Sequence, residues 1–383
     1  MFAGSPFVAV VTLRYANALA APTTADRTNI YIFLHALTIL HLFYSPTNTS
    51  KMPSDACFTI KEVPGKGLGA FATRDVEPGD FILAEKPLLQ IQNAHYLAED
   101  VEAEFNKLTE EKKAVYMSLA SAHGQDPSKY PTATSSEVTD KRERRRIHEQ
   151  HEARIGEDKT VFSICMTNAM QVEEGAGIFE IASRFNHACV PNACFCWDEE
   201  KKVETIYAVH DIAQGEVRDF RTLFLGCANT RQEITLCYCD PFYDISMRKW
   251  ELMHYGFECQ CKACKNPDDP ESFAHASRER RWKMRNLDAA LRIAVSASEQ
   301  LQVRLDLVGT MKAEGMCTPY MDFLYLEIAR ICAQGEDYVT AAKAAKKAQE
   351  TYSICVGAEN HRALKAGKSV RAFERQIPGG LKK

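Results

Sequence analysis

The segment Phe257-Glu258-Cys259-Gln260-Cys261-Lys262-Ala263-Cys264 places three cysteines within six residues. Three thiolates this close can wrap one face of a tetrahedral metal ion, and zinc favours four such ligands in closed structural sites. The natural candidate for the fourth ligand is Cys189, which lies in Asn186-His187-Ala188-Cys189-Val190-Pro191-Asn192. The alternative is a group of buried thiols that pack as small hydrophobes, but the polar neighbours of these cysteines disfavour it. We therefore expect a structural zinc site formed by Cys189, Cys259, Cys261 and Cys264.

The bulk composition is ordinary for a soluble globular protein. The chain has 383 residues, of which 45% are hydrophobic and 26% charged, so it is long enough for two or three domains with a sizeable core. A net charge of -4 gives no reason to expect generic attraction to nucleic acid or to anionic membranes. One cysteine-dense patch in a long chain fits a reducing compartment and a metal site better than a secreted disulfide scaffold.

Four further cysteines, Cys194, Cys196, Cys237 and Cys239, alternate along apparent strands. We expect these four to be core thiols and not a second metal site.

The first 51 residues differ from the rest of the chain. The apolar run from Ile30 to Tyr44 is short for a membrane-spanning helix, which needs about 20 apolar residues. The run also lies too far from a basic N-terminus for a secretory signal peptide. We expect residues 1–51 to be an extension outside the folded domain, with an over-long gene model as one origin, and we expect no membrane anchor.

Glycine-punctuated short strands predict a β core at the start of the folded region. Phe58–Ile60, Ala70–Ala72 and Phe81–Glu85 read as strands that are separated by turns, which is typical of small antiparallel sheets. In residues 93–160 the apolar residues recur at helical spacing, which predicts a helical insertion. The basic run Lys141–Arg146 in this insertion is either a solvated helix face or a nuclear-import patch, and we favour the helix face. Short strands are expected again from Thr160 to Tyr238.

Helices are expected from Pro270 to the end of the chain. Tyr325–Ile331 and Ala341–Ala348 form an alanine-rich pair that is joined at Gly335. Small residues at i and i+4 let two helices pack closely, as in tetratricopeptide-like (TPR-like) hairpins. The sequence therefore predicts a C-terminal helical domain.

Three other motifs are weak when each is taken alone. Gly65-Lys66-Gly67-Leu68-Gly69 allows a close backbone approach to a ligand or simply a tight turn. Asn186-His187 places an amide and an imidazole in an apolar stretch, where they either cap the local backbone or face a ligand. Glu233-Ile234-Thr235-Leu236-Cys237-Tyr238 reads as a strand that ends in a tyrosine, and such a tyrosine is usually structural.

Together, and in this order along the chain, the four motifs resemble those of the SET-domain protein methyltransferases. The resemblance covers Cys57 to Pro267, with the helical tail behind it. Among the branches of the family it is most similar to the SMYD type. The insertion Asn93–Thr160 contains no cysteine, so the MYND zinc finger of that type is absent, as in fungal-type SET proteins.

The resemblance implies an α+β fold. It consists of a SET-type β core with a helical insertion, a cysteine-rich zinc-binding post-SET segment and a C-terminal helical TPR-like domain. The expected boundaries are 1–51 for the extension, 57–256 for the SET domain with its insertion 93–160 and an extra loop 217–232, 257–267 for the post-SET segment, and 271–376 for the helical domain.

The resemblance also implies the site residues. Lys66, Gly67 and Leu68 would lie along S-adenosylmethionine, and Asn186 and His187 would hold its amino-acid end through amide and main-chain hydrogen bonds. Phe257 matches the aromatic residue that stacks on the adenine. Tyr238 matches the active-site tyrosine, and Tyr255 matches a wall of the lysine channel. The cofactors are therefore S-adenosylmethionine and a structural zinc.

The implied function is S-adenosylmethionine-dependent protein-lysine N-methyltransfer. Methyl transfer to an amine is an in-line displacement, so positioning supplies much of the acceleration. An aromatic channel that desolvates the lysine favours its neutral, nucleophilic form. The expected partners are a histone or another protein substrate, with further proteins on the C-terminal helices. We expect the protein in the nucleus, the cytoplasm or both.

One departure from the family pattern keeps a second function open. Gly215-Glu216 is followed by the extra residues Val217–Gln232 before Glu233-Ile234-Thr235 resumes the motif. The insertion is either a surface loop at a hairpin turn or untranslated sequence included in the gene model, and we favour the latter. The alternative function is a SET protein that has lost turnover and serves as an interaction module. Direct nucleic-acid binding is disfavoured, because one basic run on a net acidic chain provides little phosphate-binding surface.

Overall fold

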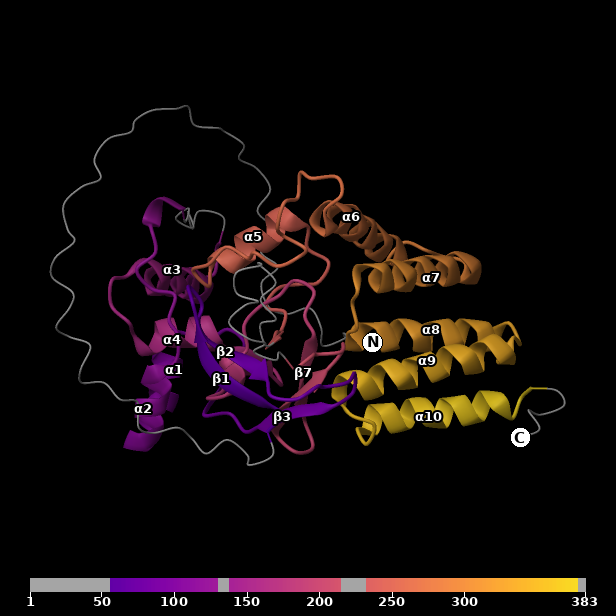
Figure 1. Ribbon diagram of the computed structural model, residues 1–383, viewed down its shortest axis with the longest axis horizontal. Coiled ribbons are helices and arrows are strands. Elements are labelled where there is room, and N and C mark those ends of the chain that lie inside the picture. The colour runs from indigo at the N-terminus through magenta and orange to yellow at the C-terminus, as the bar shows by residue number, and fades with distance from the viewer. Residues whose placement is uncertain (1–55, 130–137, 215–231, 378–383) are drawn as a thin grey trace, which may run out of the picture. The chain divides into compact units, whose positions relative to one another are not determined.

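The computed structural model describes residues 56–129, 138–214 and 232–377. The described residues from Cys57 onward form one compact unit (Figure 1). The predicted N-terminal extension 1–51 lies outside the described residues, as does the extra loop 217–232 except for Gln232. None of the described helices is long and apolar enough to cross a membrane.

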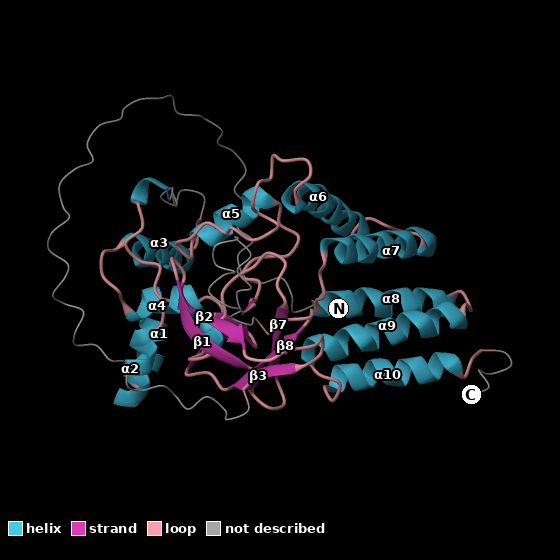
Figure 2. Ribbon diagram, viewed as in Figure 1, coloured by secondary structure: helices cyan, strands magenta, loops and turns pink. Residues whose placement is uncertain are grey.

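Nine short strands of the described residues form three antiparallel three-stranded sheets (Figure 2). The first sheet has the order β1-β2-β9, the second β3-β8-β7 and the third β4-β6-β5. This confirms the prediction of small antiparallel sheets. The strands are β1 (Phe58–Val63), β2 (Gly67–Ala72), β3 (Phe81–Glu85), β4 (Leu89–Ile91), β5 (Met170–Val172), β6 (Gly175–Ile178), β7 (Ala193–Asp198), β8 (Val203–Ala208) and β9 (Glu233–Ile234).

The insertion between β4 and β5 is helical, as predicted. It consists of α1 (Ala98–Asn106), α2 (Glu110–Ser118), the 3₁₀ turn η1 (Pro127–Lys129), α3 (Lys141–Ile155) and α4 (Val161–Asn168). Val101, Tyr116 and Phe162 of these helices form a core against β4 and β6. The basic run lies on α3, where Arg142 pairs with Asp100 and Arg145 with Glu99, so its charges are solvated and paired.

Helix α4 corrects the prediction that strands resume at Thr160. The Thr160 side chain accepts a hydrogen bond from the Ser163 amide at 3.0 Å, and the Ser163 side chain accepts one from the Thr160 amide at 2.9 Å. This reciprocal capping box starts a helix. Helix α4 is largely buried in the insertion core, so apolar residues lie on several of its faces. The apolar residues therefore do not recur at a helical spacing that can be recognised in the sequence.

The C-terminal part of the described chain is helical, as predicted. It contains α5 (Ile245–Met253), α6 (Phe273–Leu291), α7 (Ala297–Glu314), α8 (Pro319–Gln334), α9 (Tyr338–Val356) and α10 (His361–Glu374). Helices α8 and α9 form the predicted hairpin around Gly335, and Ala341, Ala345 and Ala348 are completely buried in the shared core. Helix α9 also contacts β7 and β8, which joins the helical part to the second sheet.

One buried carboxyl group stands out in the second sheet. Glu204 of β8 is completely buried and lies opposite Glu85 of β3. Glu85 accepts hydrogen bonds from the amides of residues 180–182, whereas neither carboxyl oxygen of Glu204 has a hydrogen-bond partner among the described residues. Burial, with a smaller contribution from the charge of Glu85, raises the pKa of Glu204 well above its usual value. The fold therefore favours the protonated form of Glu204.

Glu204→Gln is expected to stabilise the protein at pH 8 and to have little effect at pH 4. As the pH rises through about 4.3, the unfolded chain releases the Glu204 proton while the folded chain retains it, so the stability of the wild type falls with rising pH. Glutamine cannot ionise and removes this loss. The measurement is the melting temperature of both proteins across this pH range. Glu102→Gln on the exposed face of α1 is the control, and a Glu204→Gln protein less stable than the wild type at pH 8 would contradict the prediction.

Candidate functional site

The four cysteines of the predicted zinc site converge in the structure. Their sulfur atoms all lie within 4.8 Å of one another, and the Sγ of Cys189 is 3.4 Å from that of Cys264 and 3.9 Å from that of Cys259. Sulfurs at about 2.3 Å from a tetrahedral zinc stand about 3.8 Å apart. Cys189, Cys259 and Cys264 are buried and Cys261 is partly buried. The donor set and its spacing therefore suit a closed structural zinc site.

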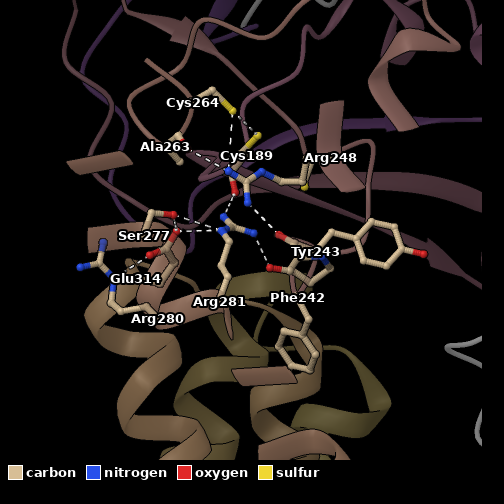
Figure 3. Close-up of polar contacts among 12 residues, drawn as sticks. Cys189, Phe242, Tyr243, Arg248, Ala263, Cys264, Ser277, Arg280, Arg281 and Glu314 are labelled. Carbon is tan, nitrogen blue, oxygen red and sulfur yellow. Dashed lines mark hydrogen bonds and ion pairs between the residues drawn. The ribbon is translucent and has the colours of Figure 1, made fainter. Parts of the chain in front are cut away.

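A buried arginine lies beside these sulfurs. Arg248 of α5 is 1% exposed, and one of its guanidinium nitrogens donates to the carbonyl of Ala263 at 2.8 Å and lies 3.7 Å from the Sγ of Cys264 (Figure 3). The other terminal nitrogen donates to the carbonyl of Tyr243 at 2.7 Å. No carboxylate of the described residues forms an ion pair with Arg248, and a buried cation needs a compensating charge. Thiolates that hold a zinc ion would supply it.

Two chain segments that are distant in sequence pair beside the cysteine cluster. The amide of Leu236 donates to the carbonyl of Asn186, and the amide of Ala188 donates to that of Leu236, both at 2.9 Å. The side chain of Asn192 accepts from the amide of Thr235 at 2.8 Å and donates to the carbonyl of Glu233 at 2.9 Å. These contacts correct the predicted strand Glu233–Tyr238. Only Glu233–Ile234 joins a sheet, because the rest of the segment pairs with the loop 186–192.

His187 links Tyr238 to the cysteine cluster. Its Nδ1 accepts a hydrogen bond from the amide of Tyr238 at 2.9 Å, and its Nε2 lies 3.2 Å from the Sγ of Cys189. Burial lowers the pKa of His187 to about 4, so the ring is neutral at physiological pH. Because Nδ1 is the acceptor, we assign the ring proton to Nε2, which then donates to the sulfur. This is the arrangement that orients a metal ligand from outside the coordination shell.

Three aromatic rings meet next to His187. The ring centroids of Tyr238 and Tyr255 are 5.1 Å apart, those of Tyr255 and Phe257 6.5 Å, and those of His187 and Phe257 6.1 Å. The hydroxyl of Tyr238 donates to the carbonyl of Phe185 at 2.5 Å. Burial raises the pKa of both tyrosines, which keeps them as neutral phenols. The three residues of this aromatic cluster (Tyr238, Tyr255 and Phe257) are each partly buried.

The glycine turn meets Asn186 on the other side of the loop. The side-chain amide of Asn186 donates to the carbonyl of Leu68 at 3.1 Å and to the Oε1 of Glu233 at 2.6 Å. The Nζ of Lys66 lies 3.4 Å from the other oxygen of Glu233. A Cβ on Gly69 would stand 2.7 Å from Glu233 Oε1 and 2.9 Å from Asn186 Nδ2. A side chain at position 69 would therefore clash with Glu233, Asn186 and Val63, whose Cγ2 would also stand 2.7 Å from the added Cβ.

One cavity in the described part of the chain does not include the aromatic cluster. It has a volume of about 770 Å³ and is lined by, among others, Glu62, Phe71, Asn192, His210 and Glu233. Tyr238, Tyr255 and Phe257 are absent from its lining. We therefore define the candidate site by the contacts among its residues and not by this cavity.

The structure brings all the predicted site residues into two adjoining groups. In the first group, Lys66 and Asn186 both contact Glu233, Asn186 also contacts Leu68, and Gly67 lies in the same turn. In the second group, His187, Tyr238, Tyr255 and Phe257 meet beside the four cysteines. The predicted core thiol Cys239 also lies within 4.8 Å of His187 and Cys189, which forms a second group of possible metal ligands. Sequence reasoning missed Arg248, and also Arg281 of α6, which is completely buried and donates to the carbonyl of Cys189 at 2.7 Å. An arginine in a helix gives no signal in the sequence that it is buried.

Comparisons with known proteins agree with the motif order. Residues 67–216 match the SET domain family. The chain is 23% identical over 332 residues to the histone-lysine N-methyltransferase set5 of Schizosaccharomyces pombe, which covers 82% of this chain and 83% of that protein. It is 28% identical over 170 residues to the histone-lysine N-methyltransferase SMYD3 of Homo sapiens, covering 44% of this chain and 33% of that protein.

Among solved structures, the chain aligns with apo ctPRC2 in an autoinhibited state over 86% of its own length and 34% of that chain. The TM-score is 0.25 at 12% identity, so this likeness supports no structural argument.

Purified protein is expected to contain one zinc ion per chain, because four thiolates at tetrahedral spacing form a closed site. Cys261→Ser should lower the zinc content measured by elemental analysis, and chelation should lower the melting temperature. Cys239→Ser is the matched control, since Cys239 is near the cluster but outside the quartet. Zinc loss in Cys239→Ser with retention in Cys261→Ser would assign the metal to His187, Cys189 and Cys239 instead.

Gly69→Ala is expected to destabilise the protein, because the new methyl group would displace Asn186 or Glu233 from their contact. Overpacking of this kind costs about 1–3 kcal/mol. The measurement is the free energy of unfolding in urea. The control is Gly309→Ala in α7, where a Cβ meets nothing within 4 Å and helix propensity favours alanine. Equal effects at both positions would refute the steric argument.

Proposed function

From the SET domain that this chain carries, we propose that the protein transfers a methyl group from S-adenosylmethionine to the ε-amine of a lysine in a protein substrate. The observation that carries the proposal is the meeting of Tyr238, Tyr255 and Phe257 with His187 beside the four-cysteine cluster. The relatives set5 and SMYD3 are histone-lysine N-methyltransferases, which supports a histone or another protein as the substrate.

Two groups of residues would bind the cofactor, which supplies an electrophilic methyl group when bound. Lys66, Gly67 and Leu68 would lie along it, while the amide of Asn186, already oriented by Leu68 and Glu233, would hold its amino-acid end. Both ring nitrogens of His187 have protein partners, so His187 would contribute through its main chain. Phe257 would stack on the adenine.

The aromatic cluster suits the acceptor lysine. A lysine that enters between aromatic rings loses hydration, which lowers its pKa and favours the neutral amine. Aromatic faces also attract cations, namely the sulfonium of the cofactor before the transfer and the methylated ammonium of the lysine after it. The hydroxyl of Tyr238 donates a hydrogen bond to the carbonyl of Phe185, so the lone pairs of its oxygen can accept a hydrogen bond from the amine. Positioning of the amine in line with the methyl group would then supply much of the acceleration.

The structural zinc would act on the site without entering the reaction. Cys189 follows Asn186 and His187, while Cys259 follows Tyr255 and Phe257 at short intervals. One metal ion held by both segments would therefore fix the aromatic residues against the cofactor loop. The C-terminal helices, which we propose to be TPR-like, would be available to protein partners in the nucleus or the cytoplasm.

A second candidate function is a protein-interaction module without turnover. The observation that favours it is the interruption of the Gly215-Glu216 motif by residues 217–232. The inserted residues lead directly into the segment that carries Thr235 and Tyr238, so they would shift Tyr238 in this candidate. A shifted tyrosine would abolish methyl transfer while leaving the fold intact.

The test is a radiolabelled methyl-transfer assay on histones and on cell extract, together with calorimetry of S-adenosylmethionine binding. We expect the wild type to bind the cofactor and incorporate label, and Asn186→Ala to weaken binding. Tyr238→Phe should lower kcat roughly 100-fold, the usual loss of one preorganised hydrogen-bonding group, with less change in cofactor affinity.

Ile293→Ala, at a position 78% exposed, is the control and should behave as the wild type. A chain that lacks residues 217–232 separates the two candidate functions. Cofactor binding without transfer by the full chain, and transfer by the shortened chain, would show that the insertion suppresses turnover. Absence of cofactor binding from both would remove the methyltransferase proposal.

A further inference from the structure

Arg281 of α6 is a completely buried cation that reaches the candidate site from the C-terminal helices. One terminal nitrogen donates to the carbonyl of Cys189 at 2.7 Å, and the other donates to the carbonyl of Pro241. Its Nε donates to the Oε1 of Glu314 in α7 at 2.9 Å and to the Oγ of Ser277 at 3.2 Å (Figure 3). A single guanidinium group thus contacts Ser277 of its own helix and three other parts of the chain, at Glu314, Pro241 and Cys189.

The two carbonyl contacts belong to functional segments. Cys189 is a proposed zinc ligand, and Pro241 lies three residues after Tyr238. A guanidinium group is a rigid planar fork, so both carbonyls must keep a fixed distance and direction from each other. The contacts therefore hold the metal ligand in register with the segment that carries Tyr238.

Arg248 repeats this pattern from α5. It donates to the carbonyl of Tyr243 and approaches Cys264, so each buried arginine joins one zinc-site cysteine to the segment Pro241–Tyr243 (Figure 3). The two arginines approach from different helices. The loop after Tyr238 is therefore fixed at two points, and one of these points depends on the C-terminal helices.

The position of Arg281 is itself fixed by Glu314. This carboxylate is completely buried, and it also accepts from Ser277 at 2.5 Å and from Arg280 at 2.6 Å. A buried ion pair is often no more stabilising than apolar residues of the same volume, because the desolvation of both charges offsets their attraction. Stability alone therefore gives a weak account of why a charged pair occupies this position.

We propose that Arg281 is a positioning residue for methyl transfer. Arg281 is held by Glu314, so the positions of the proposed zinc ligand Cys189 and of the Tyr238 segment depend on the positions of helices α6 and α7. The C-terminal helices are then part of the catalytic unit and not only a surface for partners. This inference rests on the proposed methyltransferase function.

The test compares three variants of the full chain. Arg281→Lys retains the charge beside Glu314 but cannot reach both carbonyls at once. Arg281→Met with Glu314→Gln removes both buried charges and leaves an amide for Ser277 and Arg280, which protects the fold. Arg280→Lys is the matched control, because Arg280 lies on the same helix and bonds the same carboxylate, and no contact with Cys189 or Pro241 is found for it in the described residues.

The readouts are the rate of zinc release to a chromogenic chelator, the melting temperature, and kcat and KM per zinc-loaded chain. Loss of partners that orient a metal site typically costs about 10- to 100-fold in metal affinity or activity. We expect zinc release to accelerate and kcat to fall by that factor in both Arg281 variants. The melting temperature of the Met/Gln variant should stay near that of the wild type, and Arg280→Lys should match the wild type in every readout.

A merely structural role would lower the melting temperature and leave kcat per zinc-loaded chain unchanged. That result would overturn the inference. So would Arg281 variants whose zinc release and kcat equal those of the wild type, and so would a wild-type protein that carries no zinc. A wild type that carries zinc but binds no S-adenosylmethionine would instead count against the proposed function. The comparison of zinc release would then still decide whether Arg281 positions Cys189.

Discussion

The candidate site depends on the pairing between the loop Asn186–Asn192 and the segment Glu233–Tyr238. Hydrogen bonds that Asn186, Ala188 and Asn192 form with Glu233, Thr235 and Leu236 fix the second segment along the first, so Tyr238 lies against His187. The glycine turn after β1 contacts the same loop through Asn186 and Glu233. Both groups of candidate site residues are therefore placed by one pairing of irregular backbone, and neither group lies wholly within a regular strand.

Buried charge is the second constraint on this region. Arg248 and Arg281 are almost fully excluded from water and lie against the backbone and sulfur atoms of the cysteine cluster. Only Arg281 has a carboxylate partner in the described residues, namely Glu314. The negative charge of a tetrathiolate zinc site would balance Arg248, and the metal, the arginines and the loop after Tyr238 would then form one electrostatic unit. His187 contributes a neutral donor to the same unit, because burial keeps its ring unprotonated.

Much of this arrangement was predictable from local sequence. Cysteine spacing predicted the cluster, and the order of four motifs predicted the SET domain, which the family match over residues 67–216 confirms. The small antiparallel sheets and the C-terminal helices were also predicted correctly. Two local predictions were wrong: α4 is a helix whose uniform burial hides its period, and most of the segment 233–238 is not a strand. The boundaries of the domains, the TPR-like character of the helices and the roles of the site residues stay predictions.

The sequence by itself determined the residue types of the site, namely three clustered thiols, a glycine turn, an Asn-His pair and a tyrosine at the end of a short apolar segment. Such features are readable because ligand chemistry and backbone freedom depend on a few neighbouring residues. Only the tertiary structure decided that Arg281 and Glu314, far along the chain in the C-terminal helices, are buried against Cys189. Burial of a charge depends on what surrounds it in space, and an arginine followed by ordinary helical sequence carries no local sign of that environment.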